Sequence, residues 1–254
     1  MSATPKSAGD PSDEHYSYRH YADAGVAEGF DSLRFGGPIG RFLLETQQAI
    51  LLDALAPVKG RRVVDVGTGT GRAAIGLAQA GAIVTGIDAS AQMLAVAGAR
   101  AAAAGVSVTF ERGDAHALPV ANRSVDAAVC LRVLMHAIDW RRALGELCRI
   151  SRWRVVVDFP ALGSLAALES GVRHVRQALG QRTEAYRVMS ESAVRAAFGE
   201  RGFRIVQVSR QFVLPIAFHK RMNRLDRTQA IEGALAKAGL LRLLGSPVTV
   251  VAER

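Results

Sequence analysis

A short apolar segment that runs directly into a glycine-rich turn constrains this chain more than any other feature. Residues 63–71 read VVDVGTGTG, and residues 72–80 after them have the composition of a helix. A strand, a glycine turn and a helix in this order form the cofactor-binding unit of many α/β proteins. Glycine permits positive φ and lets ligand atoms approach the main chain. The segment therefore predicts a site for an adenosine-containing cofactor, with a tight turn that binds nothing as the alternative.

The spacing of the glycines separates two kinds of cofactor. A dinucleotide fingerprint needs G-x-G-x-x-G, and its third glycine would fall at position 72, where the chain has Arg72. Asp65 stands two residues before the first glycine. A carboxylate there attracts a cationic amino group and repels a pyrophosphate. The pattern therefore disfavours an NAD-dependent reductase.

A second acidic residue follows at an informative interval. The apolar segment 82–87 ends in Asp88, close to the roughly 20-residue distance at which an acidic residue meets ribose hydroxyls. Alternatively, Asp88 caps the helix expected over 89–104, with Ser90 sharing that role. Met93, one turn into this helix, either packs in the core or forms part of an adenine pocket.

A third expected strand, 106–110, precedes the patterns G-D-A-x-x-L-P at 113–119 and S-x-D at 124–126. Together with D-x-G-x-G-x-G, these patterns resemble the motifs of class I S-adenosylmethionine-dependent methyltransferases, in the branch called type 11. The resemblance is close over residues 61–158. It implies that the cofactor is S-adenosylmethionine. It further implies cofactor-binding roles for Asp65, Gly67, Gly69, Gly71, Asp88, Met93, Asp114 and Ala115, with Asp114 accepting from the adenine amino group.

The rest of the chain continues the alternation of strands and helices. Helices are expected over 139–150, capped by Asp139, and over 192–201, and strands over 153–159, 203–214 and 247–252. We therefore expect an α/β fold, a doubly wound, mostly parallel seven-stranded sheet of Rossmann-like type. The resemblance implies that strands six and seven form an antiparallel pair at one edge.

The 254 residues fit one domain. We expect 1–15 to be a flexible tail and 16–254 to be a single methyltransferase domain. Three segments exceed the minimal fold and are expected to cap the site on the acceptor side, because ligands bind beyond the carboxyl ends of the strands. These segments are 16–57, 161–189 and 217–244.

Residues just after the fourth strand are expected to face the methyl acceptor. His136 would accept a proton or contact the acceptor, or else pack against a helix. Arg132 would pair with a carboxylate or phosphate of the acceptor, or neutralise Asp158. Tyr21 and neighbouring aromatic residues would form a flap over the cofactor, or an amphipathic capping helix. His116 and His174 are expected at the surface.

Charge and composition limit the partners. The net charge of +9 is spread along the chain, whereas a dense basic stripe marks nucleic-acid binding. Residues 129–132 read VCLR, without the proline-containing motifs of base-modifying methyltransferases, so a nucleic-acid substrate is disfavoured. The spacing of Cys130 and Cys148 suggests no metal site. Neither a signal peptide nor a membrane span is apparent, and we expect a cytoplasmic protein.

These observations predict transfer of a methyl group from S-adenosylmethionine to a small molecule. An apolar or lipid-like acceptor is one option, because residues 213–218 are mostly apolar and basic residues follow them. Two alternatives stay open. The chain could bind the cofactor without turnover, or it could be a nucleic-acid methyltransferase.

Overall fold

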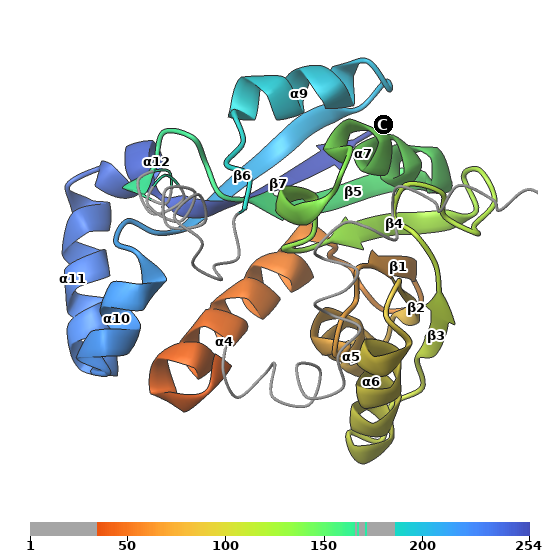
Figure 1. Ribbon diagram of the computed structural model, residues 1–254, viewed down its shortest axis with the longest axis horizontal. Coiled ribbons are helices and arrows are strands. Elements are labelled where there is room, and N and C mark those ends of the chain that lie inside the picture. Colours follow the sequence, from red (N-terminus) through yellow and green to blue (C-terminus); the bar gives the residue numbers. More distant parts are fainter. Residues whose placement is uncertain (1–34, 166, 168–170, 172–185) are drawn as a thin grey trace, which may run out of the picture.

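The computed structural model describes residues 35–165, 167, 171 and 186–254. Its centre is one seven-stranded sheet in the order β3-β2-β1-β4-β5-β7-β6 (Figure 1). The strands are β1 (Arg62–Val66), β2 (Ile83–Asp88), β3 (Thr109–Arg112), β4 (Val125–Cys130), β5 (Ser151–Phe159), β6 (Arg204–Phe212) and β7 (Ser246–Glu253). This confirms the predicted α/β class and the doubly wound sheet.

The direction of the strands also agrees with the prediction. Strands β1 to β5 pair in parallel, whereas β7 is antiparallel to both β5 and β6. The last strand of the chain therefore lies between β5 and β6, and β6 forms the edge. Parallel strands place their carboxyl ends on one side of the sheet, and the loops that follow β1, β2 and β4 meet there.

Helices cover both faces of the sheet (Figure 1). One face carries α4 (Gly37–Ala54), α5 (Arg72–Gln79) and α6 (Ala91–Ala103), and the other carries α7 (Trp140–Ile150) and α9 (Glu191–Gly199). Alternate residues of β5 divide between the two cores, with Val155 and Val157 in one and Val156 in the other. Burial on both faces explains why this strand is an almost continuous apolar run.

Side-chain caps begin three of these helices. Asp139 accepts from the N–H groups of Arg141 and Arg142 at 3.0 and 3.1 Å, which confirms it as the cap of α7. Ser90 Oγ accepts from Met93 N at 3.1 Å and caps α6. The cap of α6 is therefore Ser90 and not Asp88. Ser190 caps α9 in the same way.

The third strand differs from its predicted position. It spans Thr109–Arg112 and not 106–110. Val106 N donates to Ala101 O and Gly105 N donates to Ala102 O, which is the paired pattern of a Schellman motif. Val106 therefore closes helix α6 and does not begin the strand. Sequence alternation could not distinguish the two roles, because an apolar residue is usual at this position of the motif.

The segment 217–244 forms three helices beside α4 and β6, at the left of Figure 1. They are α10 (Ile216–Met222), α11 (Leu225–Lys237) and α12 (Leu240–Leu244). Of the other two expected cap segments, most of 161–189 and residues 16–34 lie outside the described residues. The expected tail 1–15 lies outside them as well.

A buried polar cluster fixes these helices to the end of β6. Glu232 accepts from Val213 N at 2.8 Å and from Leu214 N at 3.0 Å. His219 Nε2 lies 2.8 Å from Glu232 Oε1, and His219 Nδ1 lies 3.2 Å from Thr228 Oγ1. Buried polar groups are tolerated when they are paired in this way. The cluster therefore holds α10 and α11 to the chain that leaves the sheet.

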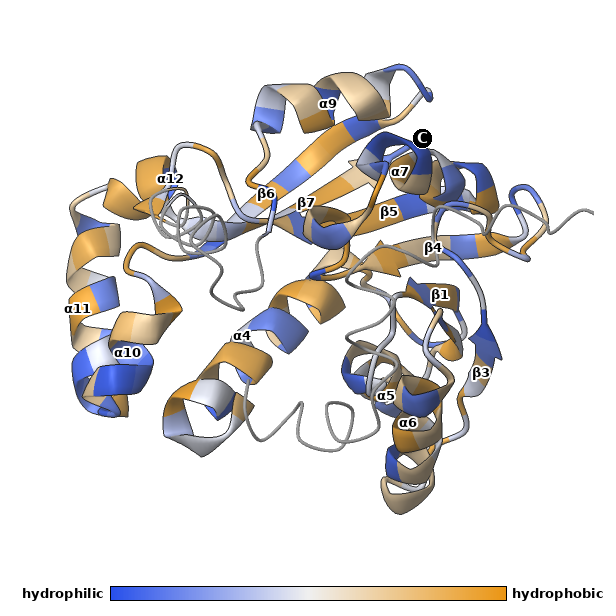
Figure 2. Ribbon diagram, in the orientation of Figure 1, coloured by the Kyte–Doolittle hydropathy of each residue, from blue (hydrophilic) through white to orange (hydrophobic). Residues whose placement is uncertain are grey.

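Hydropathy follows this architecture. In Figure 2 the strands are mainly apolar along the middle of the sheet, whereas the lower ends of α10 and α11 are strongly polar. Among the described residues, no helix is both long enough and apolar enough to cross a bilayer.

Candidate active site

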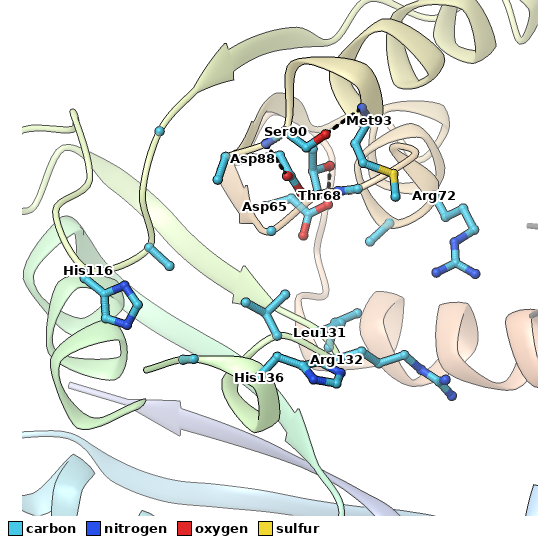
Figure 3. A pocket seen from close by; sticks show the side chains of 18 of the residues that line it. Asp65, Thr68, Arg72, Asp88, Ser90, Met93, His116, Leu131, Arg132 and His136 are labelled. Carbon is cyan, nitrogen blue, oxygen red and sulfur yellow. Dashed lines mark hydrogen bonds between the residues drawn. The ribbon is translucent and has the colours of Figure 1, made fainter. Parts of the chain in front are cut away.

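A cavity opens beyond the carboxyl ends of β1, β2 and β4 (Figure 3). The turn after β1 and the start of α5 contribute Asp65, Gly67, Thr68, Gly69, Arg72 and Ala73. The segments after β2 and β3 contribute Asp88, Ala89, Ser90, Met93, Gly113, Ala115 and His116. The segment after β4 contributes Leu131, Arg132, Val133, His136 and Ala137, and α4 contributes Gln47. The structure thus brings together most of the residues predicted from the sequence.

The glycine turn needs its first glycine for two reasons. Gly67 has a φ of 69°, and a Cβ added there would lie 2.2 Å from a methyl carbon of Val133. Gly69 also has positive φ, but a Cβ there would meet no atom within 4 Å, because the position faces the cavity. The first glycine therefore lets the segment after β4 approach, and the second keeps space for a ligand.

The N–H groups of this turn are used within the protein. Gly67 N and Thr68 N donate to Ile87 O at 2.7 and 3.0 Å, and Gly69 N donates to Asp88 Oδ2 at 2.8 Å. A pyrophosphate site presents such N–H groups to the ligand. The turn therefore provides a surface that a ligand can approach closely, and the charge at this part of the cavity comes from the neighbouring carboxylates.

Asp65 is a buried carboxylate at the end of β1. It is 2% exposed and accepts from Thr68 Oγ1 at 2.7 Å. Burial is the largest effect and raises the pKa of Asp65 to about 6, while the Thr68 hydroxyl acts in the opposite direction. The negative charge of Asp88 adds to the rise. A cationic ligand group would relieve this buried charge, as expected for a cofactor with an amino group.

Asp88 ties the glycine turn to the next strand. Its Oδ2 accepts from Gly69 N at 2.8 Å, and its Oδ1 accepts from Ser90 N at 2.9 Å. Burial raises the pKa of Asp88, and these backbone donors oppose the rise. A carboxylate has about four lone-pair sites, so both oxygens keep capacity for a further donor. The arrangement can accept from a pair of vicinal hydroxyls.

The loop after β3 departs from the prediction at two residues. Gly113 and Ala115 line the cavity, but Asp114 lies outside the lining and its Oδ1 accepts from His116 N at 2.8 Å. The prediction that His116 is a surface residue is wrong, because its side chain is 11% exposed and lines the cavity. His116 Nδ1 lies 2.7 Å from Asp114 Oδ1, and Asp139 N donates to Nε2 at 3.2 Å.

Two other predicted cofactor residues have clear packing roles. Gly71 lies outside the cavity lining, and a Cβ added there would be 3.0 Å from Ala97 Cβ. It therefore allows α5 and α6 to pack closely. Met93 lines the cavity and is 2% exposed, so it packs in the core and also forms part of the wall.

The wall after β4 carries the predicted acceptor-side residues. Arg132 has a φ of 60°, and its N–H donates to Asp158 Oδ1. Gln47 Nε2 donates to Asp158 Oδ2 at 3.0 Å. Burial raises the pKa of Asp158, and the positive charge of Arg132 is the largest opposing effect. His136 lies in the short 3₁₀ helix η1 (Leu134–His136), is 9% exposed and lines the cavity. Arg132 thus neutralises Asp158 and also faces the site.

Several lining residues escaped the sequence reasoning. Thr68 and Arg72 stand inside or next to the glycine motif, so their positions were an available signal. Gln47 is 111 residues from Asp158 in the chain, and no local pattern indicates their contact. Tyr21 and His174 lie outside the described residues. None of the described segment 217–244 lines the cavity, since it packs against α4, which supplies Gln47.

Within the described ranges, no group of three or more His, Cys, Asp or Glu side chains is arranged to hold a metal ion. Cys130 and Cys148 are buried free thiols, and burial raises the pKa of both. Their environment is that of small core residues.

Comparison with known proteins places residues 63–153 in a family described as methyltransferase domain. The ubiquinone biosynthesis O-methyltransferase of Ralstonia nicotianae is 39% identical over 125 residues, which is 46% of this chain and 52% of that protein. The malonyl-[acyl-carrier protein] O-methyltransferase of Pectobacterium atrosepticum is 38% identical over 157 residues, or 59% and 58% of the two chains. The chain spans about half the length of the curated relatives it matches.

Solved structures share the fold over almost the whole chain. Magnesium protoporphyrin IX methyltransferase from Synechocystis PCC 6803, with bound SAH (S-adenosylhomocysteine), has a TM-score of 0.68. Its sequence is 20% identical, and the match covers 94% of this chain and 97% of that one. At this identity the likeness establishes the fold. The fold, the family match and the two acidic residues beside the glycine turn are mutually consistent.

Proposed function

We propose that the chain is a class I S-adenosylmethionine-dependent methyltransferase and that it transfers a methyl group from this cofactor to a small-molecule acceptor. One observation carries the proposal furthest. The buried carboxylate of Asp65 and the half-buried carboxylate of Asp88 lie near the ends of adjacent strands and face one cavity, beside a glycine turn whose N–H groups are engaged within the protein. This donor set suits an amino group and a ribose and does not suit a pyrophosphate.

The chain's residues suggest how the cofactor would lie. Asp65 would hold the amino group, and Arg72 on the same wall would attract the carboxylate of the amino-acid part. Asp88 would accept from the two ribose hydroxyls. The adenine ring would lie near Met93 and Ala115, with Asp114 close by. Asp114 would act on adenine binding in one of two ways. It would hold the loop in place through its contacts with His116, or its side chain would turn toward the ring.

The reaction asks mainly for position and for the exclusion of water. When bound, the sulfonium of the cofactor supplies an already activated methyl group. The protein would align an acceptor atom against it, and alignment alone accounts for several kcal/mol of barrier lowering, about 7–11 in the best cases. The apolar side chains Leu131, Val133 and Ala137 surround the wall after β4 and limit access of water. His136 on this wall would accept a proton from an acceptor that arrives protonated.

We predict that His136→Ala lowers the rate of methyl transfer at least about tenfold and leaves the affinity for S-adenosylhomocysteine within about twofold. The reason is that a base or acceptor contact acts on the transition state. Steady-state kinetics and calorimetry measure the two quantities. His136→Gln is the matched variant, since it keeps a hydrogen-bonding group but accepts no proton at neutral pH. Unchanged activity in both variants contradicts the assignment, and loss of cofactor binding shows a structural histidine.

The proposal extends to partners and location. The named relatives include an enzyme of ubiquinone biosynthesis and one that acts on malonyl-[acyl-carrier protein], which supports a small organic acceptor over a nucleic acid. Two buried free thiols fit a reducing compartment, which supports a cytoplasmic location. A cofactor-binding protein without turnover is the second candidate, because the cofactor-side carboxylates alone do not require a reaction.

Isotopic labelling separates these possibilities. The protein is incubated with methyl-labelled S-adenosylmethionine and cell extract, and label is sought in small-molecule, protein and nucleic-acid fractions. We expect label in the small-molecule fraction, and we expect it to be lost with Asp88→Ala. Label confined to nucleic acid would favour that alternative. Binding of the cofactor without any labelled product in several extracts would favour the protein without turnover.

A further inference from the structure

Two arginines gather at one end of the cavity. Figure 3 shows the guanidinium groups of Arg72 and Arg132 at the end opposite His116. The guanidinium carbon of Arg72 lies 3.4 Å from the ring centroid of Phe35, and that of Arg132 lies 5.4 Å from it. The buried carboxylate of Asp158, whose pKa both arginines lower, balances part of this charge, but two guanidinium groups around one ring still make this end of the cavity favourable for a negatively charged ligand group.

The two arginines belong to different walls. Arg72 is the first residue of α5, directly after the glycine turn, and its charge acts on the pKa of Asp65. Arg132 follows β4 and shares a short segment with His136, and its charge is the largest factor that lowers the pKa of Asp158. Under the proposed function, Arg72 therefore faces the amino-acid end of the cofactor, and Arg132 faces the acceptor.

The backbone of Arg132 holds an unfavourable conformation. Its φ of 60° is in the left-handed region, which is unfavourable for a residue with a side chain. Asp158 compensates by accepting from Arg132 N, and Gln47 holds the other oxygen of Asp158 at 3.0 Å. Strained non-glycine residues that the surroundings hold firmly are typical of functional sites. Here an arginine occupies a position whose backbone conformation would favour glycine.

The surroundings of Arg132 strengthen its attraction for an anion. Leu131, Val133 and Ala137 line the same wall, and apolar neighbours lower the local dielectric constant. A guanidinium group binds carboxylate and phosphate through two parallel hydrogen bonds, which an ammonium group does not match. Such a contact beside His136 would fix both the position and the orientation of the acceptor.

We propose that Arg132 selects the acceptor, by binding a carboxylate or phosphate group of it next to His136. This inference rests on the proposed function, because it assumes that the opposite wall holds the cofactor. It assigns the acceptor to the class of small organic acids or phosphate esters. Arg72 is assigned to the cofactor by the same argument.

Binding of probe molecules to the protein saturated with S-adenosylhomocysteine tests the proposal. The probes are 4-hydroxybenzoate, phenyl phosphate and the neutral 4-hydroxybenzamide, measured by calorimetry. We expect at least one anionic probe to bind tenfold or more tightly than the amide. Comparison of the two anions distinguishes a carboxylate from a phosphate acceptor.

Four variants complete the test. Arg132→Gln should abolish the preference for the anion and leave the affinity for S-adenosylhomocysteine within twofold, while Arg132→Lys should keep part of the preference. Arg72→Gln should instead weaken the binding of S-adenosylhomocysteine. Arg141→Gln is the matched control, because Arg141 is exposed over the ring of Trp140 and should change neither quantity.

The outcomes separate the inference from the function on which it rests. Equal binding of all three probes, no binding of the anions, or a preference that survives Arg132→Gln would overturn the role of Arg132. A tenfold loss of affinity for S-adenosylhomocysteine in Arg132→Gln would assign this arginine to the cofactor, and it would also overturn the proposed role of Arg132 in binding the acceptor. If the wild-type protein fails to bind S-adenosylhomocysteine at all, the proposed function itself is wrong.

Discussion

Asp65→Asn is expected to raise the thermal stability of the cofactor-free protein and to weaken the binding of S-adenosylhomocysteine at least about thirtyfold, or about 2 kcal/mol. Both effects come from the same buried carboxylate. In the folded protein burial raises its pKa to about 6, from an ordinary value of 3.8. At pH 8 the native state therefore carries an ionised group that burial disfavours. Asparagine removes this cost, about 1–3 kcal/mol, and can still accept from the Thr68 hydroxyl.

The pH dependence follows from the direction of this shift. Between pH 4 and pH 6 the native state binds more protons at Asp65 than the unfolded state, so this group's contribution to the free energy of unfolding falls as the pH rises. The stabilisation by Asp65→Asn should therefore be full at pH 8 and small near pH 4. Cofactor affinity in the wild-type protein should decrease as the pH falls through about 6, because the carboxylate becomes protonated.

Asp126→Asn is the matched control for this change. The carboxylate of Asp126 accepts from Arg62 N and from the Arg152 guanidinium, and these donors lower its pKa despite burial. The same substitution there should lower the melting temperature at pH 8 and leave cofactor binding unchanged. Melting curves at pH 4 and pH 8 measure both variants. If Asp65→Asn also lowers the melting temperature at pH 8, or binds S-adenosylhomocysteine like the wild-type protein, the account of Asp65 is wrong.

Asp88→Ala is expected to weaken the binding of S-adenosylhomocysteine by about 2–4 kcal/mol, because charge-assisted hydrogen bonds to two ribose hydroxyls would be lost. The variant also releases the N–H groups of Gly69 and Ser90, so the cofactor-free protein should lose some stability. Asp88→Asn retains one acceptor oxygen, so its affinity for S-adenosylhomocysteine should lie between those of the wild-type protein and Asp88→Ala. Calorimetric titration and thermal melts of all three proteins measure these quantities.

Ser190→Ala separates a cofactor contact from a simple effect on helix stability. Ser190 caps α9, which lies on the other face of the sheet from α6. Its loss should cost about 1 kcal/mol of stability without any effect on binding. If Asp88→Ala behaves like Ser190→Ala, with lower stability and unchanged affinity, then Asp88 serves the turn alone.

The sequence predicted the sheet well because its signals are local. Apolar segments of strand length, each ending at an acidic residue or a glycine-rich turn, identify β1 and β2, and the helical pattern identifies α5 and α7. The start of β3 was misplaced because Val106 ends a helix, and an apolar residue suits either role. Boundaries of this kind depend on main-chain hydrogen bonds that the sequence does not display.

The residues of the site were predictable where a motif fixes the main chain, and less predictable where side chains form local hydrogen bonds with each other. Asp65 and Asp88 lie as expected because Asp65 is the penultimate residue of β1 and Asp88 is the last residue of β2. Asp114 bonds to His116 and not to the cavity, a local contact that a family motif does not reveal. Gln47 reaches the site through packing of α4, far away in the sequence, and the contribution of residues 1–34 stays a prediction.

Calorimetric titration of the cofactor-free protein with S-adenosylhomocysteine, and separately with NAD, tests the central claim most directly. We expect S-adenosylhomocysteine to bind with a micromolar dissociation constant, about −8 kcal/mol, and NAD to give no heat of binding at millimolar concentration. The affinity should decrease as the pH is lowered below about 6, where Asp65 gains its proton. Absence of binding to S-adenosylhomocysteine at millimolar concentration, or tighter binding of NAD, would contradict the account.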